Sequence, residues 1–304
     1  MIYRRGQKVL VQGITGKQGS FWAERMMETG TTIAAGVNPK RAVERHLGLP
    51  IYASAKDAMQ SERCDVSVIF IPPTMARDAI IDAVEAGIPT IVALTEHIPA
   101  HDVLDIFAAL RGTNARLIGP NTAGIVTPGE GFIGIMPGHN PTVFQPGRIG
   151  VISRSGSLGT LVCLNLTESG LGQSAFIGVG GDPMIGTTTR DALMALDADP
   201  CTTAVAMVGE IGGSMEEEAA EYAATMKKPV VAFIAGRSAP PDKKMGHAGA
   251  IVSAGQGSYA SKRAALEKVG VQVADIPAQI PRLLSATAAI PTSPEVGECV
   301  AAHR

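Results

Sequence analysis

One histidine in this sequence stands in a setting that suits nucleophilic chemistry. The segment Met245-Gly-His247-Ala-Gly249-Ala surrounds the imidazole with very small side chains, which leave the ring open to a reactant. Neutral imidazole is a nucleophile near pH 7 and can accept a phosphoryl group on one nitrogen when the other is held in place. A lone histidine is more often structural, so this motif alone leaves both roles open.

A carboxylate that could hold the second nitrogen is Glu210, within Val208-Gly-Glu210-Ile-Gly-Gly213 and just after an expected strand. Ligands of open α/β sheets bind at the carboxyl ends of the strands. We therefore expect Glu210 to hydrogen-bond His247 and to fix its tautomer. The alternative is a solvated glutamate near a turn.

Two loops between expected strands and helices could bind anions, Gly13–Gly19 and Ser153–Gly159. Glycines let backbone N–H groups approach a phosphate, and a helix N-terminus adds a favourable dipole. The first loop has the spacing G-x-x-G-x-x-G, not the dinucleotide spacing G-x-G-x-x-G, and a purely structural turn is its alternative. The alternative for the second loop is an ordinary helix N-cap. In a third loop, Gly180–Pro183, the Asp-Pro pair fits the N-cap and first position of a short turn, and its glycines indicate a loop shaped around a close neighbour.

The end of the second expected strand carries Lys40 and Arg41. An NAD site needs an acidic residue there for the ribose 2′-hydroxyl. Two cations suit a phosphorylated ribose instead, in NADP or in the 3′-phosphate of coenzyme A. An ordinary solvated Lys-Arg pair remains the alternative.

The elements that must position these residues follow an α/β pattern, in which β-branched runs alternate with alanine-rich helical stretches. We expect strands at Lys8–Val11, Thr32–Val37, Val66–Ile71, Thr90–Leu94, Leu117–Ile118, Ile149–Ser153, Ala175–Val179, Ala204–Val208, Val230–Ile234 and Val271–Asp275. We expect helices at Gly19–Glu28, Ala55–Gln60, Met75–Ala86, His101–Leu110, Leu158–Glu168, Thr187–Leu196, Met215–Met226 and Ser258–Lys268. We assign alanine-rich helices such as Glu216–Met226 wholly to packing and solvated faces.

The alternation is interrupted once, which predicts two domains. Residues 1–122 form the first domain, 123–147 a Gly- and Pro-rich connection, and 148–284 the second domain. Residues 285–304 hold two prolines without periodicity, and we expect a loosely held or disordered tail.

Composition excludes several classes of protein. The 304 residues are 45% hydrophobic and 18% charged with a net charge of −2, which argues against disorder and against a basic field for nucleic acid. Aromatic residues make up 4%, too few for base-stacking platforms. The four cysteines lack metal-ligand spacing, so no metal site is expected. With no signal peptide or membrane span recognisable, we expect a cytoplasmic protein.

Taken together, the motifs resemble the α subunits of the succinyl-CoA synthetase family, which are NDP-forming acyl-CoA ligases. The resemblance runs from about Lys8 to Leu284, and the family order of the motifs makes it specific. The segments that carry it are Val11–Gly19, Leu94–Glu96, Ile118–Asn121, Gly134–His139, Val151–Ser157, Gly178–Pro183, Gly209–Gly213 and Gly246–Gly249.

This resemblance implies a Rossmann-like CoA-binding domain followed by a flavodoxin-like domain with a phosphorylated histidine, His247, and its partner Glu210. Ser155 and Gly156 would open the helix that receives the phosphate. Arg41 stands where the family has a CoA-contacting lysine. The remaining residues that the resemblance assigns to CoA are Thr15, Gly16, Lys17, Gln18, Leu94, Thr95 and Glu96.

The resemblance also implies a partner. The family uses ATP or GTP with Mg²⁺, bound mainly on an ATP-grasp β subunit, in a heterodimer or heterotetramer. No GxxxxGK[ST] motif occurs in this chain. The family context also implies the bacterial cytosol, or the mitochondrial matrix after loss of a transit peptide.

Two departures from the family bear on the acid substrate. Thr160 stands where these synthetases have a tyrosine that lines the acid pocket, and Thr122 where they have a cysteine. A lost ring enlarges a pocket and changes its polarity. We therefore expect a short di- or tricarboxylic acid, such as succinate or a malate-like acid. The alternatives are an NADP-dependent oxidoreductase and a non-catalytic CoA-binding protein.

Overall fold

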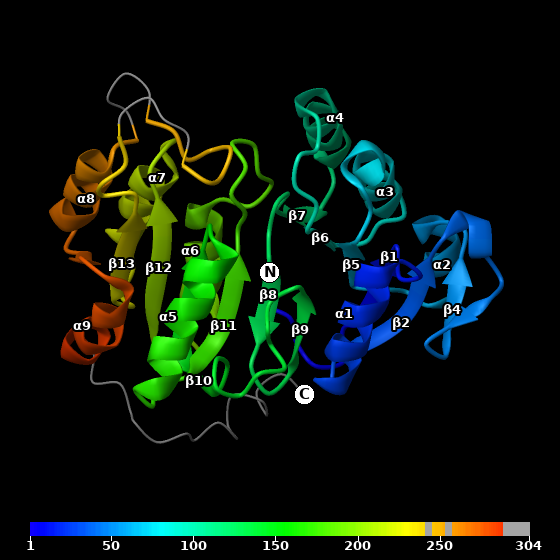
Figure 1. Cartoon of the computed structure of the whole chain (residues 1–304), viewed down its shortest axis with the longest axis horizontal. Coiled ribbons are helices and arrows are strands. Elements are labelled where there is room, and N and C mark those ends of the chain that lie inside the picture. The colour runs from blue at the N-terminus through cyan, green and yellow to red at the C-terminus, as the bar shows by residue number, and fades with distance from the viewer. Residues whose placement is uncertain (241–244, 253–256, 288–304) are drawn as a thin grey trace. The chain divides into compact units, whose positions relative to one another are not determined.

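Two mainly parallel sheets organise the chain in the computed structural model, which describes residues 1–240, 245–252 and 257–287 (Figure 1). Contacts between Cα atoms divide the chain into two units. The first comprises most of residues 1–139 together with 184–187, and the second comprises residues 140–183 and the described residues from 188 onward.

The sheet of the first unit has the strand order β3-β4-β2-β1-β5-β6-β7, in which only the short β3 runs antiparallel to its neighbour. Without β3 this is the strand order of the Rossmann fold. The strands are β1 (Lys8–Gln12), β2 (Thr32–Val37), β3 (Arg45–His46), β4 (Leu49–Tyr52), β5 (Val66–Ile69), β6 (Thr90–Ala93) and β7 (Arg116–Ile118).

Apolar periodicity explains how the helices of this unit pack. Helix α1 buries Gly19, Ala23 and Met26, which share one face of a 3.6-residue period. Helix α3 packs between α2 and α4. The helices are α1 (Lys17–Glu28), α2 (Ala55–Ser61), α3 (Pro73–Glu85) and α4 (Ala100–Leu110), with a 3₁₀ turn, η1, at Pro39–Arg41.

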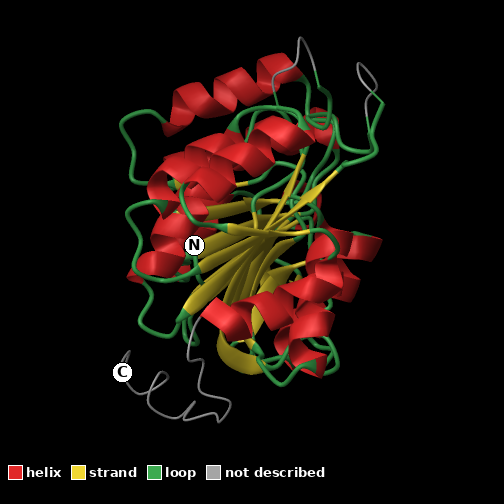
Figure 2. Cartoon of the chain, turned by 90° about the vertical axis from the view of Figure 1, so that its left-hand side faces the viewer, coloured by secondary structure: helices red, strands yellow, loops and turns green. Residues whose placement is uncertain are grey.

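In the second unit, parallel strands lie in the order β14-β13-β12-β10-β11. This is the flavodoxin-like order, and every residue of β11 and β12 is buried, as expected for a sheet covered on both faces. Figure 2 shows helices on both sides of the strands. The strands are β10 (Pro146–Ser153), β11 (Gln173–Gly178), β12 (Ala204–Glu210), β13 (Val230–Ala235) and β14 (Gln272–Ala274).

The helices of the second unit form two groups. Helices α5 and α9 contact each other, and α7 lies between α6 and α8. Their bounds are α5 (Gly156–Glu168), α6 (Thr189–Ala198), α7 (Met215–Ala223), α8 (Tyr259–Lys268) and α9 (Ile280–Thr287), with a 3₁₀ turn, η2, at Pro277–Gln279.

Every strand and helix expected from the sequence is present, with ends shifted by at most three residues. The α/β class and the Rossmann-like and flavodoxin-like folds are confirmed. The sequence interpretation missed β3, β4, α9 and an antiparallel hairpin of β8 (Gly124–Thr127) and β9 (Gly131–Gly134).

The hairpin lies inside the segment 123–147 that we expected to be a connection. Its strands approach each other at glycines, and a Cβ on Gly124 would come within 2.0 Å of the Ile133 carbonyl oxygen. Such glycines have no side chain to produce an alternating pattern. Within the expected tail, residues 285–287 belong to α9, and the remainder lies outside the described residues.

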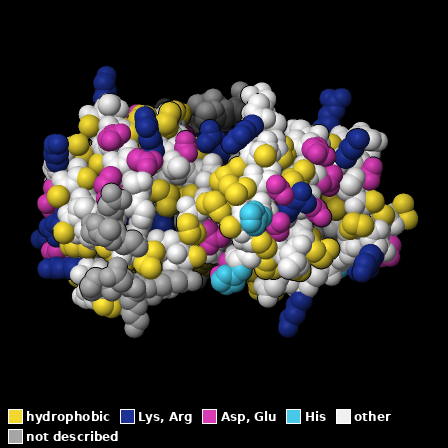
Figure 3. Space-filling model, turned by 90° about the horizontal axis from the view of Figure 1, so that it is seen from above, with side chains coloured by type: hydrophobic (Ala, Val, Ile, Leu, Met, Phe, Trp, Pro, Cys, Tyr) yellow, Lys and Arg dark blue, Asp and Glu magenta, His cyan; other side chains and the backbone are white. Residues whose placement is uncertain are grey.

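Cysteines of the described residues are free thiols in buried positions: Cys64, Cys163 and Cys201. Burial raises the pKa of the Cys64 thiol to about 11 and holds that of Cys163 well above its ordinary value. On the face seen in Figure 3, cationic and anionic side chains are interspersed. Across the described residues, no helix combines the length and apolar content needed to cross a membrane.

Candidate functional site

The carboxyl ends of β10 and β12 bring two of the predicted motifs to one edge of the second sheet. Strand β10 ends at Ser153, whose register partner on β12 is Val208, and β12 ends at Glu210. The order of the parallel strands changes direction here, because β11 lies on one side of β10 and β12 on the other. Such switch points form the ligand crevices of open α/β sheets.

His247 meets Glu210 at this edge. Nδ1 of the imidazole lies 2.8 Å from Oε2 and 3.0 Å from Oε1 of the carboxylate. Because an ionised carboxylate only accepts hydrogen bonds, Nδ1 carries the proton and Nε2 of the neutral ring keeps its lone pair. The His247 side chain is 28% exposed, whereas that of Glu210 is 9% exposed. The structure therefore brings the predicted pair together with the tautomer that leaves Nε2 nucleophilic.

Electrostatics at the imidazole act in both directions. The hydrogen bond from Nδ1 to Glu210 raises the pKa of His247 above its ordinary value, while burial and the charge of Arg154 oppose the rise. Asp182 adds a smaller upward contribution to the pKa. The site thus stabilises positive charge on the ring, and this is the charge that develops when Nε2 forms a fourth bond.

Glycines give the imidazole its place. A Cβ on Gly181 would lie 2.4 Å from Cγ of His247, so no other residue fits without moving the ring. A Cβ on Gly249 would come within 3.0 Å of Nη2 of Arg154. The two glycines also contact each other, since the Gly249 N–H donates to the Gly181 carbonyl oxygen at 3.2 Å. The glycine loop is therefore shaped for the histidine.

Helix α5 begins at the same edge. Ser155 is its N-cap, and Oγ accepts from the Leu158 N–H at a long 3.4 Å. Gly156 is the first helical residue, and the Thr160 hydroxyl donates back to the Gly156 carbonyl oxygen at 2.9 Å. The N-terminus of this 13-residue helix can contribute backbone N–H groups and a dipole to an anion.

Sequence reasoning missed the charged groups behind Glu210. Arg154, Glu216 and Lys262 are at most 1% exposed at their side chains. Nζ of Lys262 lies 2.5 Å from Oε2 of Glu216, and Arg154 reaches both Glu210 and Glu216. The assignment of Glu216–Met226 wholly to packing and solvated faces did not foresee that the Glu216 carboxylate is buried against these cations. A polar helical pattern gives no sign of such burial.

In the first unit, the glycine turn leads from β1 directly into α1. Gly13 has a φ of +84°, and a Cβ on Gly19 would lie 2.2 Å from the Gly13 carbonyl oxygen. Gly16 is the N-cap of α1, and no side chain caps the helix there, so its first N–H groups are open to a ligand. Lys17 and Gln18 are exposed at this end.

The side chains of this turn already have protein contacts. Oγ1 of Thr15 accepts from Nδ2 of Asn38 at 2.6 Å. Oε1 of Gln18 accepts from Nε1 of Trp22 at 3.2 Å. The turn is therefore held by the end of β2 and by the next turn of α1, with Lys17 exposed beside it.

Arg41 closes the 3₁₀ turn η1 just after β2. Its guanidinium forms an ion pair with Glu44 at 2.8 Å and is 42% exposed. A phosphate approaching Arg41 would have to compete with that carboxylate.

Leu94, Thr95 and Glu96 directly follow β6, at the same edge of the first sheet as the glycine turn. The Thr95 hydroxyl donates to the Ile71 carbonyl oxygen at 2.7 Å, and Leu94 is partly buried. Glu96 is exposed. The predicted first-unit residues therefore converge on the carboxyl ends of parallel strands, where ligands bind in this fold.

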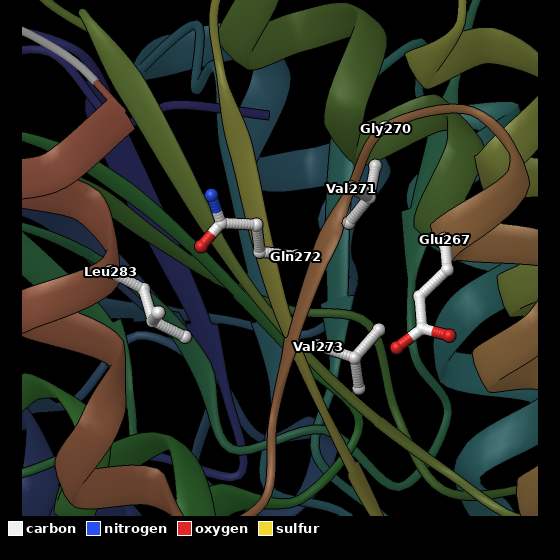
Figure 4. Close-up of a pocket in the computed structure, with 6 residues that line it drawn as sticks. All are labelled: Glu267, Gly270, Val271, Gln272, Val273 and Leu283. Carbon is white, nitrogen blue, oxygen red and sulfur yellow. The ribbon is translucent and has the colours of Figure 1, made fainter.

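Two hollows in the second unit differ in chemical content. One of about 690 Å³ adjoins the histidine loop and is lined in part by Arg154, Ala248 and Gly249. The other, of about 370 Å³, lies at the β14 edge and is lined by Glu267, Gly270, Val271, Gln272, Val273 and Leu283 (Figure 4). The ionisable member of that lining, Glu267, pairs with Arg263 at 2.7 Å. The chemistry therefore lies at the histidine edge.

Comparisons with known families match both units. Residues 5–97 match the family model described as CoA binding domain, and residues 152–272 match the one described as CoA-ligase. The second match accounts for the motifs of the second unit, which an oxidoreductase would leave without a role.

Curated relatives extend over most of the chain. A succinate–CoA ligase [ADP-forming] subunit alpha 2 of Archaeoglobus fulgidus is 48% identical over 278 residues, covering 91% of this chain and 96% of the relative. The alpha subunit of Aquifex aeolicus is 46% identical and covers 92% of each chain. A subunit of an ADP-forming sulfoacetate-CoA ligase from Acholeplasma sp. is 44% identical, covering 92% of this chain and 95% of its own.

Among solved structures, an ATP citrate lyase of Methanosaeta concilii in complex with (3S)-citryl-CoA superposes with a TM-score of 0.84 at 22% identity. The match covers all of this chain and 55% of the lyase chain. At this identity the likeness establishes the fold alone.

Proposed function

Because this chain belongs to the family of ADP-forming succinate–CoA ligase α subunits, we propose that it is the CoA-binding, phosphohistidine-bearing subunit of an NDP-forming carboxylate–CoA ligase. The observation that carries the proposal is the His247–Glu210 pair, in which both carboxylate oxygens lie within 3.0 Å of Nδ1. Such a pair leaves Nε2 as the phosphoryl acceptor and offsets the charge that the ring gains.

His247 takes part in two phosphoryl transfers. Nε2 attacks the γ-phosphorus of a nucleoside triphosphate, and the bond to the bridging oxygen breaks so that the nucleoside diphosphate leaves with the electron pair. A carboxylate oxygen of the acid then attacks the phosphorus, and Nε2 leaves with its lone pair restored. Throughout, Glu210 retains the Nδ1 proton in its hydrogen bond.

The acyl phosphate made in this way has a good leaving group. The CoA sulfur attacks the acyl carbon, the C–O bond to phosphate breaks, and the thiol proton leaves with the phosphate. A free carboxylate would instead have to expel oxide, which is why the reaction is divided into steps. Ser155 and Gly156 at the N-terminus of α5 supply dipoles for the phosphoryl group.

CoA fits the first unit. Its phosphates would meet the open N-terminus of α1 at Gly16, Lys17 and Gln18, beside the Thr15 hydroxyl. Arg41 would pair with a phosphate in exchange for Glu44. Leu94, Thr95 and Glu96 would contact CoA farther along the same sheet edge.

The nucleotide, ATP or GTP with Mg²⁺, would bind on a separate ATP-grasp β subunit. The curated relatives are named as subunits, which supports a two-subunit enzyme. We propose a heterodimer or heterotetramer that acts on a short di- or tricarboxylic acid. A relative named for sulfoacetate indicates that acids vary among close homologues. Thr160 gives this chain a small hydroxyl side chain in the segment assigned to the acid.

The test uses the complex co-purified with its β subunit. Incubation with labelled ATP and Mg²⁺ should place acid-labile, base-stable phosphate on this chain, and His247→Asn should abolish the label. Label that persists in that variant would contradict the proposal. Titration calorimetry with CoA and with NADPH distinguishes the proposed ligase subunit from an oxidoreductase. The ligase subunit should bind CoA, whereas an oxidoreductase should bind NADPH tightly and CoA not at all.

A panel of carboxylic acids, assayed by thioester formation, tests the acid class. We expect succinate to be one of several good substrates. Strict preference for succinate would contradict the inference drawn from Thr160.

A further inference from the structure

All three polar groups of Glu210 are fixed by neighbouring residues. Its N–H donates to Oε1 of Glu216 at 3.2 Å, its carbonyl oxygen accepts from Nη1 of Arg154 at 3.4 Å, and its carboxylate Oε1 lies 3.3 Å from Nη2 of Arg154. Nη1 also donates to the Gly212 carbonyl oxygen at 3.3 Å. One arginine thus holds both the backbone and the side chain of the residue that orients the histidine.

We propose that Arg154 is a positioning residue that keeps Glu210 oriented and holds His247 in its neutral, nucleophilic form. The inference rests on the proposed phosphohistidine chemistry and names a residue that controls it. Arg154 itself is 1% exposed at its side chain, and both of its Nη atoms contact Glu210 or residues beside it. Its buried Nε has no hydrogen-bond partner among the described residues. Arg154 therefore acts through Glu210 by way of its Nη atoms.

The charges behind Arg154 balance. Among the described side chains that are at most 9% exposed, Glu210 and Glu216 face Arg154 and Lys262. Lys262 also donates to the Gly213 carbonyl oxygen at 2.9 Å and to the partly exposed Glu217 at 2.9 Å. A buried set with equal numbers of positive and negative groups avoids the large cost of an uncompensated buried charge. Glu216 therefore fixes Arg154 from behind, and Lys262 pairs with Glu216 on its other side.

The charged neighbours of His247 determine the pH at which its imidazole takes up a second proton. The groups that face it are Glu210 at the end of β12, Arg154 after β10 and Asp182 in the loop after β11. Among the described residues, both carboxylates favour the imidazolium form, and Arg154 opposes them. Without Arg154 the ring would hold its second proton to higher pH, and a protonated Nε2 cannot attack phosphorus.

The experiment titrates His247 in the full-length chain. Histidine ring signals are followed by NMR against pH, with His247→Asn used for assignment, in the wild type, Arg154→Met and Arg148→Met. Arg148 lies on the same strand, β10, away from its carboxyl end, so Arg148→Met is the matched control. We expect the titration of His247 to move up by about one pH unit in Arg154→Met and to stay in place in the control. Equal titrations in all three proteins would overturn the proposal.

A second variant, Arg154→Lys, tests the proposal in case Arg154→Met does not fold. Arg154→Lys keeps the positive charge but cannot form the planar fork that reaches the carbonyl and the carboxylate together. In the complex with the β subunit, we expect it to phosphorylate at least tenfold more slowly than wild type, although His247 titrates near its wild-type pH. Wild-type phosphorylation by Arg154→Lys would overturn the positioning role. Because the NMR titration needs no turnover, it tests Arg154 even if wild-type phosphorylation is never observed, and that failure would count against the proposed function alone.

Discussion

The substitution Glu210→Gln tests the charge of the carboxylate that holds His247. Glutamine has almost the same shape and can still accept one hydrogen bond from Nδ1, but it replaces two contacts of 2.8 and 3.0 Å to an anion with one to a neutral group. Hydrogen bonds to charged groups contribute about 1.5–3 kcal/mol, against about 1 kcal/mol for neutral ones. The transition state for phosphorylation, in which the ring becomes cationic, should therefore lose about 1–2 kcal/mol, or roughly a factor of ten in rate.

Rapid-quench phosphorylation of the two-subunit complex with labelled ATP measures this rate. Glu218→Gln is the matched control, because Glu218 is exposed in the first turn of α7 and contacts Ser214. A Glu210→Gln rate within twofold of wild type across the pH range would refute the charge argument. A Glu218→Gln rate that falls equally would show that the loss has another cause.

Glu210→Gln should also change how the free energy of unfolding depends on pH. Glu210 raises the pKa of His247 above 6.5, so the stabilisation from this pair is fully present below pH 6.5 and is lost as the pH rises through the raised value. The difference in unfolding free energy between wild type and Glu210→Gln should therefore be larger at pH 5.5 than at pH 9. Urea titrations at both pH values measure it, and a difference that grows with pH would contradict the assignment.

Three further substitutions follow from the geometry. Gly181→Ala should displace the imidazole of His247, since the new Cβ would lie 2.4 Å from its Cγ. We expect phosphorylation to fall at least tenfold, while the affinity for CoA measured by calorimetry stays unchanged. Normal labelling would mean that the ring has room to move. Lys262→Met should lower the unfolding free energy in urea by about 3–5 kcal/mol, because it leaves Arg154 as the remaining cation of the buried set for both Glu210 and Glu216, and adding Glu216→Gln should recover part of it; a loss below about 1 kcal/mol would show that Lys262 does not supply this compensation. Glu44→Gln should free Arg41 and tighten CoA binding a few-fold by calorimetry, whereas unchanged affinity would place the phosphates elsewhere.

Much of the fold could be predicted because most strands of the two sheets are short β-branched runs that lie between helices in the sequence. The pairing of His247 with Glu210 was predictable for a related reason, since Glu210 ends a strand and strand ends converge at a switch point. The hairpin of β8 and β9 was not predictable, because Gly124 and Gly134 replace the side chains that would have alternated.

The buried charges at the site could not be predicted from hydropathy. Lys262 lies in Tyr259–Lys268, a helix in which half of the residues are polar or charged, yet its side chain is 0% exposed. Its charge is compensated because α7, α8 and the loop after β10 lie side by side in the folded chain, and only the structure shows this. The neighbouring motif at Ser153–Gly156 was visible, but the role of Arg154 within it was not.

The inert thiols of the core matter for a protein that would handle activated acyl groups. Thiolates are strong nucleophiles, and an acyl phosphate beside a reactive cysteine would transfer its acyl group to the protein instead of to the thiol of CoA. Cys64 and Cys163 are buried and protonated far above neutral pH, so neither competes for the acyl group. These two thiols therefore do not react with the acyl phosphate that the enzyme would form, and the protein avoids acylating itself at these positions.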